Sequence, residues 1–148
     1  MSEKLLEWKL DDRVAVLTMS SGENRLNIPF CEELLLALDN IEKESEALTL
    51  VVASSHSHIW CNGFDVDWVR GRLEAGDREA VKRFLKIDLE LRKRLLAYPL
   101  ITIAAINGHV FGGGAVLSCC FDFRFKRSDR GFFCIPAIDN NFALLPGT

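Results

Sequence analysis

The chain lacks the sequence patterns that mark nucleotide and nucleic-acid binding. Its glycines do not form a GxGxxG sequence and no GxxxxGK[ST] sequence is present, so neither a dinucleotide site nor a P-loop is indicated. The net charge is −3, and no Lys/Arg-rich stripe interleaved with aromatic residues occurs. Without a positive field for a polyanion, nucleic acid is not an expected partner.

Metal-ligand spacing and long apolar runs are also absent. His56 and His58 flank Ser57, but no carboxylate or cysteine stands beside them in a ligand pattern, so we expect no metal site. The N-terminus has no signal-peptide pattern and no apolar run is long enough to span a bilayer, so we expect an intracellular protein without a membrane span. The cysteines lack CxxC spacing and are expected to be small core residues in a reducing compartment: Cys31, Cys61, Cys119, Cys120 and Cys134.

What is present is the composition of one globular domain. The 148 residues are 49% hydrophobic and 26% charged, which is enough to bury a core. Apolar periodicity predicts a hairpin of strands 5–10 and 14–19, a helix capped by Asn27, strand 48–53, helix 77–97, strand 101–106, helix 113–120, and strands 121–127 and 132–135. Alternating strands and helices favour the α/β class.

The segment 101–120 contains the most informative motif. An apolar strand leads into Gly112, Gly113 and Gly114, and an apolar helix follows. Glycines allow another group to approach the main chain closely, and a helix start leaves N–H donors without intrahelical partners. Such donors favour a developing oxyanion. The alternative is that these glycines only permit tight packing and unusual dihedral angles.

Two segments together resemble the crotonase (enoyl-CoA hydratase/isomerase) superfamily. They are Ile59-Trp-Cys-Asn-Gly-Phe-Asp-Val and Ala104-Ala-Ile-Asn-Gly-His-Val-Phe-Gly-Gly-Gly. The resemblance implies a β/α spiral in which the N–H groups of Phe64 and Gly113 polarise a thioester carbonyl. It also implies that an acyl-CoA passes between two loops, with coenzyme A as part of the substrate and no separate cofactor. The loop residues would be Cys61, Asn62, Gly63, Asp65, Gly112 and Gly114.

Within that superfamily, the sequence around Asn62 and around Asp129 most resembles that of 3-enoyl-CoA to 2-enoyl-CoA isomerases, including plant-like ones. The two positions where family hydratases carry glutamates hold Val116 and Ala137, which cannot transfer a proton. Asp139 would share the face of Ala137 if that stretch were extended, which makes it a candidate substitute base, with solvation or capping as the alternative. Asp65 is expected to cap a short helix.

The resemblance therefore implies an acyl-CoA enzyme that isomerises or hydrates a fatty enoyl-CoA, with weak or absent activity because the glutamates are missing. The alternative is a non-catalytic CoA-ester-binding or interaction protein, such as a shortened isoform. We expect residues 1–148 to form an incomplete crotonase-like core, because an apolar stretch meets a turn signal at 143–148 and the C-terminal helical region of the family is absent. Family members form homo-oligomers, commonly trimers and hexamers. Cytoplasm, peroxisome and mitochondrion remain open as compartments.

Overall fold

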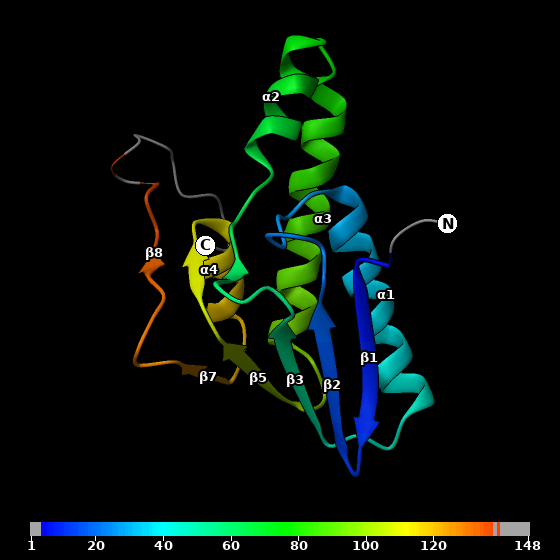
Figure 1. Cartoon of the computed structure of the whole chain (residues 1–148). Helices are drawn as coiled ribbons and strands as arrows, with labels where there is room; N and C mark the ends of the chain where they lie inside the picture. Colours follow the sequence, from blue (N-terminus) through cyan, green and yellow to red (C-terminus); the bar gives the residue numbers. More distant parts are fainter. Residues whose placement is uncertain (1–3, 138, 140–148) are drawn as a thin grey trace.

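The computed structural model describes residues 4–137 and 139 and contains a five-stranded main sheet. Its strands stand in the order β1-β2-β3-β5-β7 (Figure 1). The bounds are Leu6–Asp11 for β1, Val14–Met19 for β2, Thr49–Ser54 for β3, Ile101–Ile106 for β5 and Phe123–Lys126 for β7. β1 and β2 are antiparallel, which confirms the predicted hairpin, and the other pairs are parallel.

A second, smaller sheet accompanies the main one. It consists of three parallel strands in the order β4-β6-β8, namely Ile59–Cys61, His109–Phe111 and Phe133–Cys134. Each short strand follows a long one in the chain: β4 follows β3, β6 follows β5 and β8 follows β7. The chain therefore moves from one sheet to the other on each turn, which is the predicted β/α spiral.

The short strands β4 and β6 correct the sequence prediction, which placed residues 54–63 in a loop and let strand 101–106 run directly into the glycine turn. Each of these strands has three residues. So short a segment shows no measurable apolar alternation, and its partner lies far away in the chain. Pairing with β6 therefore decides the conformation of β4.

Residues 4–137 also contain four helices: α1 (Ile28–Glu44), α2 (Val66–Glu74), α3 (Arg78–Leu96) and α4 (Gly113–Cys119). The Asn27 side chain accepts the Phe30 N–H at 3.0 Å, so it caps α1 as predicted. In Figure 1, α1 and α3 run side by side along the main sheet, whereas α2 and the adjoining turns of α3 extend beyond it. α2 has no buried residue, which fits this position.

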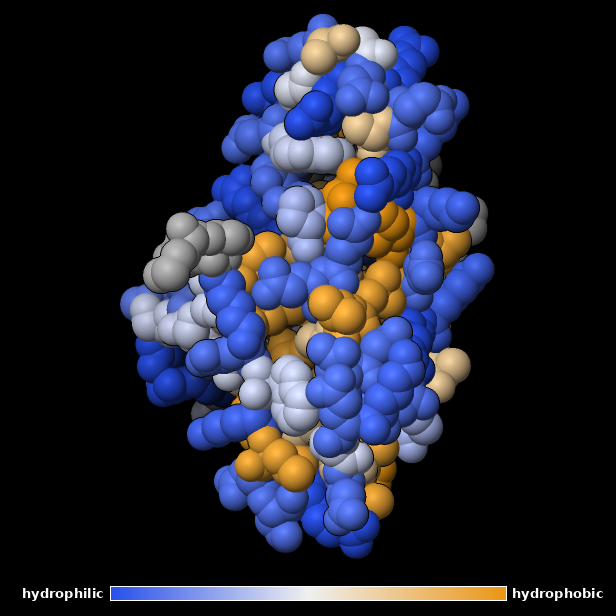
Figure 2. All heavy atoms as spheres, turned by 90° about the vertical axis from the view of Figure 1, so that its right-hand side faces the viewer, coloured by the Kyte–Doolittle hydropathy of each residue, from blue (hydrophilic) through white to orange (hydrophobic). Residues whose placement is uncertain are grey.

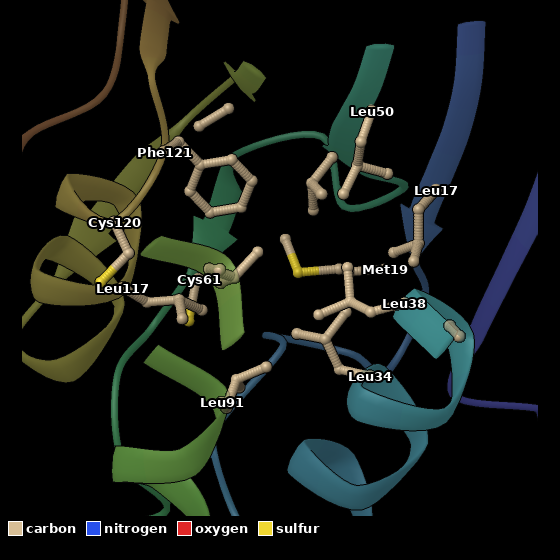
Figure 3. Packing of buried hydrophobic residues seen from close by; sticks show 14 of the residues in the cluster. Leu17, Met19, Leu34, Leu38, Leu50, Cys61, Leu91, Leu117, Cys120 and Phe121 are labelled. Carbon is tan, nitrogen blue, oxygen red and sulfur yellow. The ribbon is translucent and has the colours of Figure 1, made fainter. Parts of the chain in front are cut away.

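The core lies between the main sheet and these helices. Leu17 and Leu50 point from the sheet toward Leu34 and Leu38 of α1, and Leu91 approaches from α3 (Figure 3). The side of the molecule that carries β1 and α1 is mostly hydrophilic, with apolar groups gathered in limited patches (Figure 2). No helix within residues 4–137 is long and apolar enough to cross a membrane.

The cysteine prediction is partly wrong. Cys31, Cys61 and Cys120 are buried, as expected for core residues. Cys119, however, is exposed at the end of α4, and Cys134 in β8 is half-buried. Neighbouring residues 119 and 120 point in different directions at the end of a helix, so only one of the two thiols reaches the interior.

Candidate active site

The first turn of the site follows β4. Phe64 forms an isolated parallel bridge with Leu26, in which the Leu26 N–H donates to the Gly63 carbonyl at 2.7 Å and the Asp65 N–H donates to the Leu26 carbonyl at 2.9 Å. No peptide bond in the described chain is cis. In a trans peptide, the carbonyl of Gly63 and the N–H of Phe64 point in opposite directions. The Phe64 N–H is therefore directed away from Leu26.

The second turn opens α4. Gly112 has φ +49° and ψ −119°, a combination that glycine alone adopts readily. Its carbonyl accepts the Val116 N–H at 3.1 Å, so the Gly113 N–H, which belongs to the same peptide, points out of the helix start. Among the described residues, no side chain caps this end of α4.

The two turns pack directly against each other. A Cβ atom on Gly63 would lie 2.7 Å from the Phe111 carbonyl oxygen and 3.2 Å from the Gly113 nitrogen. A Cβ atom on Gly113 would lie 2.6 Å from Cε1 of Phe64, so the edge of that ring rests on the Gly113 backbone. Within the described part of the chain, neither the Phe64 N–H nor the Gly113 N–H donates a hydrogen bond. Two neighbouring unused main-chain donors are what an oxyanion site requires.

Gly114 and Cys61 join α4 to β4. A Cβ atom on Gly114 would lie 2.6 Å from the Cys61 sulfur and 2.7 Å from the Cys61 carbonyl oxygen. The Cys61 thiol donates to the Asn24 carbonyl at 3.0 Å, and burial raises the pKa of this thiol to about 12. The packing interpretation of the glycine run therefore holds for Gly114. The Cys61 side chain faces the interior and supports the loop from behind.

The polar residues beside the Phe64 turn are used for structure. The Asp65 carboxylate accepts an N–H of α2 at 3.1 Å and a bond from the Asn27 amide at 3.3 Å, so the predicted capping role is confirmed. The Asn62 amide donates to Glu23 at 2.8 Å. This bond, together with one from Arg25, holds the pKa of Glu23 below its ordinary value.

Neither position of the family glutamates carries a carboxylate. Val116 and Ala137 are half-buried and carry no ionisable group. Asp139 is exposed and Ala137 is half-buried, and both lie in turns, so the premise of an extended stretch that would put both side chains on one face is wrong. Asp122 accepts both the N–H and the hydroxyl of Thr102, at 2.8 and 2.9 Å, which makes it a structural residue.

His109, which could have entered the site, is packed instead. Its ring stacks on Phe111 at 5.5 Å and on Phe132 at 5.2 Å between centroids. Its Nδ1 accepts the Phe132 N–H at 3.1 Å. The predicted turn at 144–147 lies outside the described residues.

Sequence reasoning missed a buried ion pair behind the Phe64 turn. Asp88 and Arg92 of α3 form a pair with 2.7 Å between Oδ2 and Nη2, and both side chains are only 3% exposed. A signal was available, because both residues follow Phe84 at intervals of four on the buried stripe of the helix. Two opposite charges on an apolar stripe indicate a buried pair.

Comparison with known proteins decides the family. Residues 1–138 match the family model described as enoyl-CoA hydratase/isomerase. The chain belongs to the enoyl-CoA hydratase/isomerase family. The resemblance found in the two glycine-containing segments is thereby confirmed.

Relatives of this family member include isomerases. Enoyl-CoA delta isomerase 2, peroxisomal, of Arabidopsis thaliana is 27% identical over 135 residues, which are 88% of this chain and 55% of that protein. Ethylmalonyl-CoA decarboxylase of Danio rerio is 32% identical over 137 residues, 90% of this chain and 43% of that protein. The chain spans about half the length of the curated relatives it matches.

A solved structure shows the same fold. The enoyl-CoA hydratase structure from Geobacillus kaustophilus superimposes with a TM-score of 0.84 at 20% identity, over 99% of this chain and 54% of that one. The spiral of paired long and short strands is therefore the fold of this family.

Proposed function

We propose that this family member binds fatty acyl-CoA thioesters between the Gly63–Phe64 turn and the start of α4, and that it isomerises 3-enoyl-CoA to 2-enoyl-CoA. The observation that supports the proposal is the direct packing of these two turns, each with an N–H that no described acceptor uses. In the proposed complex, the N–H groups of Phe64 and Gly113 donate to the thioester oxygen. Asn62, Gly63 and Gly112 shape the loops around the acyl-CoA.

The proposed reaction moves one proton between two carbons. A base removes a proton from C2 of 3-enoyl-CoA, and the electron pair is delocalised onto the thioester oxygen as a dienolate. The two N–H groups stabilise this charge without reorganising, and losing one such donor typically costs about 10²–10³-fold in rate. Protonation at C4 places the double bond between C2 and C3. One carboxylic acid can carry out both proton transfers.

Isomerisation is favoured over hydration because Val116 and Ala137 provide no pair of acids to activate and deliver water. Asp139 is the proposed proton acceptor because it is the carboxylate nearest to Ala137 in the sequence, and its side chain is exposed. Asp139→Asn should abolish isomerisation while leaving acyl-CoA binding unchanged. An active Asp139→Asn protein would remove Asp139 from the mechanism.

Conversion of 3-hexenoyl-CoA to 2-hexenoyl-CoA tests the proposed function. Gly113→Pro removes the N–H and adds side-chain atoms, whereas Gly113→Ala adds the same Cβ and keeps the N–H. We expect kcat to fall by about 10²–10³-fold more in the proline variant than in the alanine variant. Equal kcat values in the two variants would reject Gly113 as an oxyanion donor.

The second candidate function is CoA-ester binding without turnover, and the absence of ionisable side chains at Val116 and Ala137 favours it. Calorimetry with hexanoyl-CoA, combined with the isomerase assay, separates the two. Binding without turnover supports the second candidate, and no binding rejects both. Isomerase activity gained by Ala137→Glu would show that the rest of the site is intact.

Self-association through apolar surface is proposed as well, because the family resemblance implies a homo-oligomer. Large apolar side chains on β7, in β8 and just before β8 are exposed, which supports an interface there: Phe123, Phe125, Phe133 and Phe132. Light scattering should show a homo-oligomer. A stable monomer at high concentration would contradict this part of the proposal.

A further inference from the structure

The Phe64 ring is held from three sides. One edge rests on the backbone of Gly113, where an added Cβ would lie 2.6 Å from Cε1. The Phe84 ring meets it edge-on, with 5.0 Å between centroids and an interplanar angle of 79°. The guanidinium carbon of Arg92 lies 5.9 Å from the Phe64 centroid. α3 therefore contacts the side chain whose backbone N–H faces the proposed oxyanion site.

Arg92 is held against this ring by Asp88. The two residues lie one helical turn apart, and the 2.7 Å ion pair is almost completely buried. Within the described chain, Oδ1 of Asp88 and Nε of Arg92 have no hydrogen-bond partner, and Nη2 of Arg92 has the ion-pair contact alone. Burial raises the pKa of Asp88, and the Arg92 charge opposes that shift.

An ion pair of this kind is a poor source of stability. Two charges lose their hydration in the interior, and well-packed apolar residues of similar volume often give an equally stable or more stable protein. Both side chains also have buried polar atoms without a hydrogen bond, which makes the contribution of the pair to the free energy of unfolding less favourable still. The contact with Phe64 offers a different reason for the pair, because a desolvated cation near an aromatic ring is attracted more strongly than an exposed one.

We propose that the Asp88–Arg92 pair positions the Phe64 amide: Arg92 and Phe84 hold the Phe64 ring against Gly113, and this contact sets the distance between the two oxyanion donors. The inference rests on the proposed oxyanion role of Phe64 and Gly113. Arg92 contacts the ring and Asp88 pairs with Arg92, so both are positioning residues that act through Phe64. The N–H groups of Phe64 and Gly113 must donate to the same thioester oxygen. A shift of the Phe64 ring changes the distance between these two donors, so the oxygen can no longer accept both hydrogen bonds in good geometry.

The test uses hexanoyl-CoA labelled with ¹³C at the thioester carbonyl. Its infrared carbonyl band shifts to lower frequency when hydrogen bonds polarise it, whether or not the protein turns over substrate. The double variant Asp88→Leu/Arg92→Met removes both charges together and leaves no unpaired charge in the core. Arg94→Met is the matched control, because Arg94 lies on the same helix and pairs with Asp39 of α1 at 3.1 Å.

We expect the double variant to bind hexanoyl-CoA with its carbonyl band displaced toward the value of the free thioester, and to lose about ten- to a hundredfold in kcat at similar KM. Arg94→Met should keep the wild-type band. A double variant with the wild-type band overturns the inference. A wild-type protein that binds hexanoyl-CoA without any band shift overturns the proposed oxyanion hole instead.

A second variant keeps the inference testable if the double variant does not fold. Phe64→Leu retains the backbone N–H and removes the ring that Arg92 contacts. We expect the same displacement of the carbonyl band, and no further displacement when the three substitutions are combined, because they act through one contact. A Phe64→Leu protein with the wild-type band would also overturn the inference.

Discussion

Gly114→Ala tests how closely α4 packs on β4. The added Cβ would lie 2.6 Å from the Cys61 sulfur, 2.7 Å from the Cys61 carbonyl oxygen and 2.9 Å from the Cys61 Cβ. Alanine gains about 1 kcal/mol over glycine in helix propensity. Overpacking of a core costs about 1–3 kcal/mol, and here the upper end or more applies, because a backbone oxygen can move only with its strand.

We therefore expect Gly114→Ala to lower the free energy of unfolding by about 2 kcal/mol, which corresponds to a decrease of about 6 °C in Tm for a domain of this size. Thermal and urea unfolding of the full chain measure it. Gly71→Ala is the matched control: Gly71 lies inside α2 with nothing within 4 Å of its added Cβ, so that variant should gain about 0.5–1 kcal/mol.

A partner substitution identifies the cause. Cys61→Ala in the Gly114→Ala background removes the sulfur contact and leaves the carbonyl contact at 2.7 Å, so a double-mutant cycle should show partial recovery only. If Gly114→Ala had the same free energy of unfolding as Gly71→Ala, the direct packing of α4 on β4 would be refuted.

Other predictions concern capping, acid stability and thiol reactivity. Asn27→Ala should cost about 1 kcal/mol of unfolding free energy in urea, because the cap of α1 is lost. Hydrogen bonds from Thr102 lower the pKa of Asp122. The ionised carboxylate therefore stabilises the folded state above the ordinary pKa of 3.8, and this stabilisation is lost as pH falls through the lowered pKa. Asp122→Asn should therefore unfold more readily than wild type at neutral pH, and equally in strong acid. Mass spectrometry after N-ethylmaleimide treatment should find Cys119 modified first and Cys61 only after unfolding; early Cys61 modification would contradict its burial.

Local patterns were sufficient for the long elements. The hairpin, α1, β3, α3 and β5 were predicted because each is long enough to show its apolar period and each begins or ends at a recognisable residue, such as Asn27. Asp65 was likewise predicted to cap a helix, since the capping interaction involves only neighbouring residues.

Predictions failed where the deciding contact lies far away in the chain. β4 exists because it pairs with β6, in a register that places Cys61 opposite Val110. Asp139 was placed on the face of Ala137 on the assumption of extended backbone, and the chain turns there. Neither outcome depends on the composition of the segment itself.

Residue type and short spacing were enough to predict the class of fold, the family and two glycine turns with free main-chain donors. The close packing of Gly63 on Gly113, and the charged pair of α3 behind Phe64, became visible in the folded chain alone. Those contacts join separate turns of the spiral. Their geometry follows from strand pairing and helix packing across the whole chain, which no local pattern specifies.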